Sequence, residues 1–165
     1  NFRSLWLIAS VLIIFGVILG VADRFGSSNK SLKDLSIGHG LLYGLAQSLA
    51  LIPGVSRSGA TIAMGRILGY SREAALRYSF LLALPAVFGS GLYELKGAIS
   101  QSDGANVFTL GQTLLATVVA FVIGYLVIAW LIRFITNRSF APFIVYRIAL
   151  GALVLALLST GVISS

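Results

Sequence analysis

Long apolar stretches separated by short polar segments dominate this chain. Four of them carry few charges and have about the twenty residues that a helix needs to cross the hydrocarbon core of a bilayer. They predict membrane-spanning helices at Leu5–Ala22, Ala74–Tyr93, Leu114–Ile132 and Phe143–Val162. None has the alternating pattern of about ten residues that marks a strand of an outer-membrane barrel. The pattern therefore predicts an all-α integral membrane protein with four transmembrane helices.

A fifth apolar stretch is interrupted at its centre. Ile37–Ile52 is too short to span comfortably and is followed by a proline and a glycine, after which a second short helix is predicted at Ala60–Gly69. Irregular backbone at membrane depth is tolerated where it lines a cavity within the protein. We therefore predict a re-entrant helical hairpin over residues 37–69, with an irregular loop at residues 53–61. Broken helices of this kind form the central sites of many inverted-repeat membrane proteins, so the chain, 1–165, is predicted to be a single transmembrane domain of such a fold.

Helix-capping signals mark where several of these elements begin. Ser71 is predicted to cap the helix that follows it. Thr109 and Gln112 have the spacing of a capping box, and Pro142 suits the first helical position of the last helix. The polar segment Asp23–Ser36 is predicted to be a surface loop.

Composition supports a membrane protein and narrows its chemistry. Hydrophobic residues make up 58% of the chain, charged residues 10%, and the mean hydropathy is +0.97, values that a soluble domain with a polar surface does not reach. The absence of cysteine excludes disulfides and thiolate metal sites, and the single histidine excludes a multi-histidine metal cluster. The net charge of +7 does not indicate nucleic acid, because the basic residues stand at the ends of apolar segments.

The distribution of lysine and arginine predicts the orientation in the membrane. Most of these residues fall on one side of the predicted topology, which the positive-inside rule makes cytoplasmic. That side carries Arg24, Lys30, Lys33, Arg66, Arg72, Arg77, Arg133, Arg138 and Arg147, and the other carries Arg3 and Lys96. Arg66, Arg72 and Arg77 are interpreted as interface residues that snorkel, with contact to a second phosphate as the alternative for Arg66. The loop Lys96–Thr109 and the C-terminus are then outside, and the hairpin enters from the cytoplasmic side.

The loop at residues 53–61 concentrates polar groups between apolar segments. An arginine at membrane depth is costly, so Arg57 is predicted to face a cavity or a polar partner. Its guanidinium offers a planar fork of donors that matches phosphate oxygens, and the helix that follows presents an anion-attracting N-terminus. The loop hydroxyls are Ser56, Ser58 and Thr61, and its glycines, which let backbone amides approach a ligand, are Gly54 and Gly59. Together these groups predict a diphosphate-binding site.

These polar residues also allow structural interpretations. Arg57 could instead bridge backbone carbonyls at a helix break, but the convergence of donors where a helix begins favours the anion site. Gln47 lies two turns before the break and either points its amide at the ligand or joins two helices, and both alternatives stay open. His39 is interpreted as structural, because no acidic residue lies near it in sequence to orient it as a base.

The sequence around the loop resembles a known family. Gly44–Thr61 reads Gly-Leu-Ala-Gln-Ser-Leu-Ala-Leu-Ile-Pro-Gly-Val-Ser-Arg-Ser-Gly-Ala-Thr and, with Ala75–Pro85, is similar to the second signature region of the bacterial undecaprenyl pyrophosphate phosphatases, the bacitracin-resistance family. The resemblance implies hydrolysis of undecaprenyl diphosphate to the monophosphate at the outer face of the bacterial cytoplasmic membrane, in recycling of a cell-wall carrier lipid. It implies catalytic roles for Ser56, Arg57 and Thr61, and substrate contacts from Gly54, Ser58, Gly59 and Gln47.

The family's first signature, an E-x-x-x-E pair followed by Ser-Ser-Thr-Gly-His, does not occur in this chain. The resemblance therefore implies that the chain is the C-terminal part of a longer protein, whose N-terminal half supplies the nucleophile and general base. It also implies a divalent cation, Mg²⁺ or Ca²⁺, and leaves a homodimer open. The chain alone is expected to bind a polyprenyl diphosphate without cleaving it.

A polyprenyl-phosphate transporter or flippase is the main alternative. Inverted repeats with broken helices are also transporter architecture. The sequence argues against it, because a proton-coupled carrier needs a carboxylate within the membrane, and Glu73 and Glu94 stand at the ends of spans.

Overall fold

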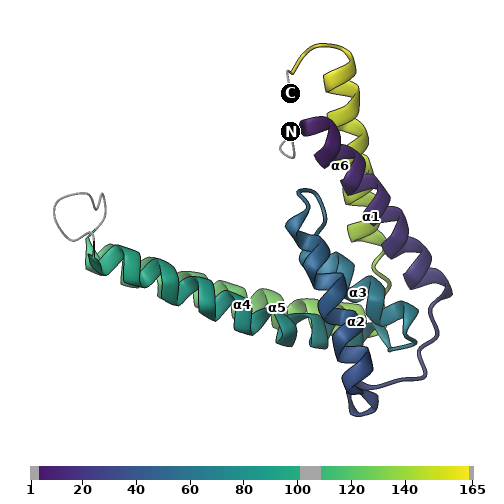
Figure 1. Cartoon of the computed structure of the whole chain (residues 1–165), viewed down its shortest axis with the longest axis horizontal. Helices are drawn as coiled ribbons and strands as arrows, with labels where there is room; N and C mark the ends of the chain where they lie inside the picture. Colours follow the sequence, from purple (N-terminus) through teal and green to yellow (C-terminus); the bar gives the residue numbers. More distant parts are fainter. Residues whose placement is uncertain (1–3, 101–108, 164–165) are drawn as a thin grey trace.

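A computed structural model describes residues 4–100 and 109–163, and these residues form a set of helices (Figure 1). The α-helices are α1 (Leu5–Phe25), α2 (Ile37–Ser48), α3 (Arg57–Ile67), α4 (Arg72–Ser100), α5 (Leu110–Asn137) and α6 (Ala141–Ser159). Two 3₁₀ turns, η1 (Leu32–Asp34) and η2 (Leu49–Leu51), precede and follow α2. Within the described residues, extended pairing is limited to a bridge between Lys30 and Tyr70.

Four helices are long and apolar enough to cross a membrane, which confirms the predicted spans and the all-α class. They are Leu5–Phe25, Arg72–Gly97, Gly111–Asn137 and Ala141–Ser159. Each extends beyond at least one end of its predicted range, since helical backbone continues past the apolar core of a span. Helix α4 reaches Ser100, so it takes in the start of the predicted loop Lys96–Thr109, and residues 101–108 of that loop lie outside the described residues.

The predicted helix starts are confirmed. The Ser71 hydroxyl accepts the amide of Ala74 at 3.2 Å. Thr109 and Gln112 form a reciprocal capping box at the start of α5. Helix α6 begins at Ala141, one residue before the predicted start at Pro142, so the proline is the second residue of its first turn. These starts were predictable because each depends on residues close together in the sequence.

The short helices α2 and α3 form a hairpin. The start of α2 contacts the segment that follows α3, where the His39 Nδ1 lies 2.7 Å from the Tyr70 hydroxyl. Their tip points along α1 toward the start of that helix (Figure 1), and a β-carbon added to Gly54 in the tip would lie 2.7 Å from the carbonyl oxygen of Ile8. Helix α3 begins at Arg57 and not at Ala60, because the preceding Ser56 acts as its N-cap.

Helices α1 and α6 run side by side, and the start of α1 lies near the end of α6 (Figure 1). Their contact is close at Gly151, where a β-carbon would lie 2.8 Å from the Ala9 carbonyl oxygen. Helices α4 and α5 form a second pair, which leaves the first at a wide angle (Figure 1). The hydrophobic core lies where the two pairs and the hairpin meet.

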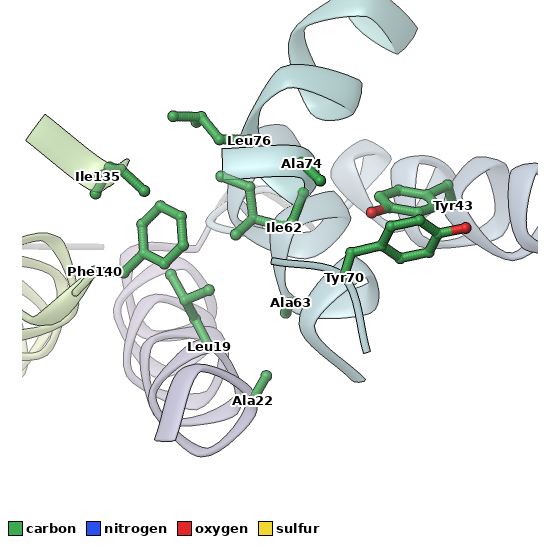
Figure 2. Packing of buried hydrophobic residues seen from close by; sticks show 11 residues of the cluster. Leu19, Ala22, Tyr43, Ile62, Ala63, Tyr70, Ala74, Leu76, Ile135 and Phe140 are labelled. Atoms are coloured by element: carbon green, nitrogen blue, oxygen red, sulfur yellow. The ribbon is translucent and has the colours of Figure 1, made fainter. Parts of the chain in front are cut away.

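Side chains from most of the helices fill this core. In Figure 2 the ring of Phe140 lies among Leu19 of α1, Leu76 of α4 and Ile135 of α5. A second part of the core joins the hairpin to α4 through the ring of Tyr43, which packs edge to face on Tyr78 of α4 with centroids 4.6 Å apart. Tyr43 also packs edge to face on Tyr70, just before α4, with centroids 5.9 Å apart. Tyr43 and Tyr70 are fully buried.

The prediction of a surface loop at Asp23–Ser36 is wrong at its first residues. Helix α1 continues to Phe25, and Asp23 is buried. Its carboxylate accepts the amide of Phe140 at 3.2 Å and pairs with Arg72 at 2.5 Å and with Arg66 at 3.6 Å. The carboxylate therefore ties α1 to α3, α4 and the start of α6.

The interpretation of Arg66 and Arg72 as snorkelling residues is wrong. Arg66 is only 2% exposed and donates to the carbonyl oxygens of Gly26, Ser27 and Tyr70. Burial lowers the pKa of Arg66, and the charge of Asp23 opposes that shift. The third residue of the set, Arg77, is half exposed and pairs with Glu73 at 2.8 Å.

Candidate functional site

The start of α3 presents a cluster of unsatisfied donors. The Ser56 hydroxyl accepts the amide of Gly59 at 3.2 Å and lies 3.3 Å from the Ser58 hydroxyl. The amides of Arg57 and Ser58 make no hydrogen bond within the described part of the chain. Such free amides at a helix N-terminus, with two hydroxyls beside them, are suited to bind an anion.

Gly54 holds the loop against α1. Its φ of +95° lies in the left-handed region that favours glycine, and an added β-carbon would lie 3.1 Å from the Val11 β-carbon as well as against the Ile8 carbonyl. No other residue type fits this position without strain. The loop is therefore positioned by backbone contact with a membrane-spanning helix.

Replacing Gly54 by alanine is expected to destabilise the protein by about 1–3 kcal/mol through backbone strain alone. The displaced loop is also expected to bind phosphate compounds less well. Thermal unfolding in detergent, with polyprenyl diphosphate binding as the second readout, measures both effects. The matched control is Gly44→Ala in α2, where nothing lies within 4 Å of the added β-carbon. Equal stability of the two variants would show that the loop adapts freely.

A cavity of about 380 Å³ opens beside this cluster. Ser56, Ser58 and Gly59 line one end of it together with Arg147 of α6. Apart from Tyr146, the other lining side chains are apolar and come from α1, α3, α4, α5 and the start of α6. The cavity thus combines a polar, positively charged end with apolar walls.

Arg147 is the site residue that the sequence analysis missed. Its Nη2 donates to the Gly54 carbonyl at 2.9 Å, and its Nη1 lies 3.1 Å from the place of a β-carbon at Gly59. Its Nε is buried and has no hydrogen-bond partner. Counting Arg147 as an interface charge was therefore wrong. The available signal was its position several residues inside an apolar span, where an arginine marks a functional site by default.

Arg57 and Thr61 lie outside the cavity lining to which Ser56 and Ser58 belong. The Arg57 side chain is exposed and makes no hydrogen bond or ion pair with the described residues. Thr61 is fully buried, and its hydroxyl lies 2.6 Å from the Ser79 hydroxyl and donates to the carbonyls of Arg57 and Ser58. Thr61 in this arrangement joins α3 to α4 behind the loop. The catalytic roles of both residues stay predictions.

Gln47 and His39 lie on α2, outside the cavity lining. The Gln47 side-chain oxygen is buried without a hydrogen-bond partner, so neither of its two predicted roles is decided. His39 contacts the Tyr70 hydroxyl, which in turn donates to the Asp34 carbonyl at 3.1 Å. This agrees with the structural interpretation of the histidine.

The described residues do not form a metal site by themselves. Across residues 4–100 and 109–163, no three His, Cys, Asp or Glu side chains come together as ligands. Serine hydroxyls and an arginine are poor partners for a hard divalent cation, which prefers carboxylate oxygens. The residues present at the loop therefore do not fit the predicted Mg²⁺ or Ca²⁺.

One protein family and many individual proteins match this chain. The family described as Bacitracin resistance protein BacA matches residues 1–153. An undecaprenyl-diphosphatase of Nocardioides sp. is 58% identical over the whole chain, which covers 59% of that protein. An undecaprenyl-diphosphatase of Renibacterium salmoninarum is 59% identical over 99% of the chain, which covers 59% of that protein. An undecaprenyl-diphosphatase of Thermobifida fusca is 57% identical over 99% of the chain, which covers 54% of that protein. The chain thus spans somewhat more than half the length of these relatives.

Proposed function

Because the chain belongs to the bacitracin resistance protein BacA family, we propose that it is part of a membrane-bound hydrolase that converts undecaprenyl diphosphate to the monophosphate. In this reaction water adds its oxygen to the terminal phosphorus. The bridging P–O bond breaks, and inorganic phosphate leaves. The chain contributes the loop that binds the diphosphate.

The observation that supports this proposal is the amphipathic cavity beside the start of α3. The Ser56 and Ser58 hydroxyls, the free amides of the first helical turn and the Arg147 guanidinium converge at its polar end. Donors arranged before the substrate arrives stabilise the charge that develops on phosphate oxygens. The apolar walls suit a lipid and not a soluble phosphate compound.

We assign the two arginines separate tasks. Arg147 lies inside the cavity and already holds the loop through Gly54. Arg57 is exposed on the first turn of α3, so its guanidinium has room to swing toward the terminal phosphate and bind it through two parallel hydrogen bonds. The Ser56 and Ser58 hydroxyls and the free amides of Arg57 and Ser58 complete the set of donors.

The remaining components of the reaction are assigned outside the loop. No carboxylate lies beside Ser56 in the described residues, so we propose that the base, the nucleophile and the ligands of a divalent cation come from the part of the relatives' length that this chain does not match. We further propose that the hairpin re-enters the bacterial cytoplasmic membrane and that the site opens to its outer face. The only buried carboxylate of the described residues, Asp23, is bound by two arginines, which does not favour a proton-coupled transporter.

Phosphate release tests the proposal. The full-length protein in detergent is expected to release phosphate from undecaprenyl diphosphate, and Arg57→Lys is expected to lower turnover by about 10- to 100-fold, because an ammonium cannot form the bidentate contact. Arg24→Lys, at an exposed position of α1, is the control and should keep full turnover. Full activity of Arg57→Lys would remove Arg57 from the site. Translocation of a polyprenyl phosphate without release of phosphate would favour the transporter.

A further inference from the structure

A buried pair of hydroxyls lies behind the first turn of α3. Thr61 of α3 is 0% exposed and Ser79 of α4 is 3% exposed, and their hydroxyl oxygens lie 2.6 Å apart. Burying a hydroxyl is costly unless it is hydrogen-bonded, so each of the two depends on the other. Ser79 does not line the cavity, to which α4 contributes Leu76 and Phe80. Ser79 therefore does not touch a ligand in the cavity.

The hydrogen bonds around this pair identify Ser79 as its donor. The Thr61 hydroxyl has one hydrogen, which it shares between the carbonyl oxygens of Arg57 at 3.0 Å and Ser58 at 3.1 Å. Its oxygen is then left to accept, and the Ser79 hydroxyl makes no other hydrogen bond within residues 4–100 and 109–163. A directed chain of hydrogen bonds thus runs from Ser79 through Thr61 to the backbone of the first turn of α3.

Thr61 differs from the threonines of α5 that bond their own helix. Thr113, Thr117 and Thr136 each donate to a single carbonyl four residues earlier, and all three are exposed. A threonine inside a helix commonly makes this contact without any link to another element. Thr61 is fully buried and also bonds a second helix, so its hydroxyl is held from α4 as well as from α3.

The Arg57 carbonyl belongs to the same peptide unit as the Ser58 amide. Because the C=O and N–H groups of a planar trans peptide point in opposite directions, a contact that fixes the carbonyl also fixes the direction of the amide. The Ser58 amide is one of the two that make no hydrogen bond within the described part of the chain. A hydrogen bond to the carbonyl also polarises the peptide, which strengthens its amide as a donor.

We propose that Ser79 is a positioning residue, which aims the Ser58 amide at a phosphate oxygen through its hydrogen bond to Thr61. The inference rests on the proposed function, in which the free amides of this turn bind the diphosphate. The first turn of a helix has unpaired amides and is held less firmly than the helix interior. The contact with α4 supplies the orientation that the turn lacks, and Ser79 acts on the ligand only through Thr61 and the backbone.

Binding of undecaprenyl methylenediphosphonate, in which a CH₂ group replaces the bridging oxygen, tests the inference without hydrolysis. In the full-length protein, Ser79→Ala and Thr61→Val are each expected to raise the Kd of this analogue about tenfold. The double variant should stay within about twofold of Thr61→Val, because Ser79 acts only through Thr61. Only folded protein contributes to the Kd, so a smaller folded fraction does not imitate the effect.

Ser79→Cys keeps the test intact if the alanine variant does not fold. Cysteine is close to serine in size and its thiol is a weak donor, so the Kd is expected to rise, but less than in Ser79→Ala. A Kd in Ser79→Cys equal to that of the unaltered protein would show that the strength of this donor does not matter, which overturns the inference.

Ser90→Ala on α4 and Thr117→Val on α5 are the matched controls. Both hydroxyls are exposed and bond only their own helix, so the Kd should change by less than about twofold. An unchanged Kd in Ser79→Ala, or losses in Ser79→Ala and Thr61→Val that multiply in the double variant, overturns the inference. If the variants show the expected pattern but the unaltered protein releases no phosphate from undecaprenyl diphosphate, the proposed function fails and the positioning role stands.

Discussion

Replacing Arg147 by methionine is expected to lower the turnover of undecaprenyl diphosphate by about 10²–10³-fold, the usual cost of removing one donor from a preorganised anion site. Arg147 supplies the positive charge inside the cavity and bonds the Gly54 carbonyl that shapes the loop. Methionine has a similar length and removes both contributions without overfilling the space. Phosphate release by the full-length protein measures the effect.

Two further variants separate binding from loop support. Arg147→Lys keeps the charge but offers a single ammonium in place of the fork that reaches Gly54 and Gly59, so an intermediate loss is expected. Arg133→Met removes an exposed arginine from α5 and should leave turnover unchanged. If Arg147→Met hydrolysed the substrate as fast as Arg133→Met, Arg147 would have no part in the site.

Replacing Asp23 by asparagine is expected to destabilise the protein by about 3–5 kcal/mol, the range found when one partner of a buried ion pair is removed. Asparagine keeps an acceptor for the Phe140 amide but leaves the buried Arg66 without a counter-charge. The loss should appear as a lower free energy of unfolding in detergent. It should also loosen α3, and with it the loop, since Arg66 lies on that helix.

The exposed pair on α4 provides the control for this prediction. Glu73→Gln breaks an i,i+4 pair in which both side chains are partly exposed, and a change of about 0.5 kcal/mol or less is expected. A double replacement, Asp23→Leu with Arg66→Met, should recover part of the stability lost in Asp23→Asn, because it removes the uncompensated charge. A fully stable Asp23→Asn protein would mean that water or lipid compensates Arg66.

Features that depend on neighbouring residues were predictable from the sequence. The four spans follow from the length of apolar stretches, and the starts at Ser71 and Thr109 follow from capping residues within three positions. The hairpin follows from a proline and a glycine that interrupt a short apolar stretch. The proximity of Ser56, Ser58 and Gly59 was predictable for the same reason, since they belong to one turn at the start of a single helix.

Features that depend on distant residues were decided by the tertiary structure. Arg147 is 93 residues from Gly54, and Asp23 is 117 residues from Phe140, so the spacing along the chain held no sign of either contact. Asp23 stands at the end of an apolar stretch, where a charge at the membrane interface is the simplest interpretation, and the position of Arg147 inside a span marks it as functional without naming its partner. Whether such a charge snorkels or turns inward depends on which helices pack against it. The sequence by itself determined the helices and the polar loop; only the packing of α1, α4, α5 and α6 decided which cation faces the loop and where the apolar cavity leads.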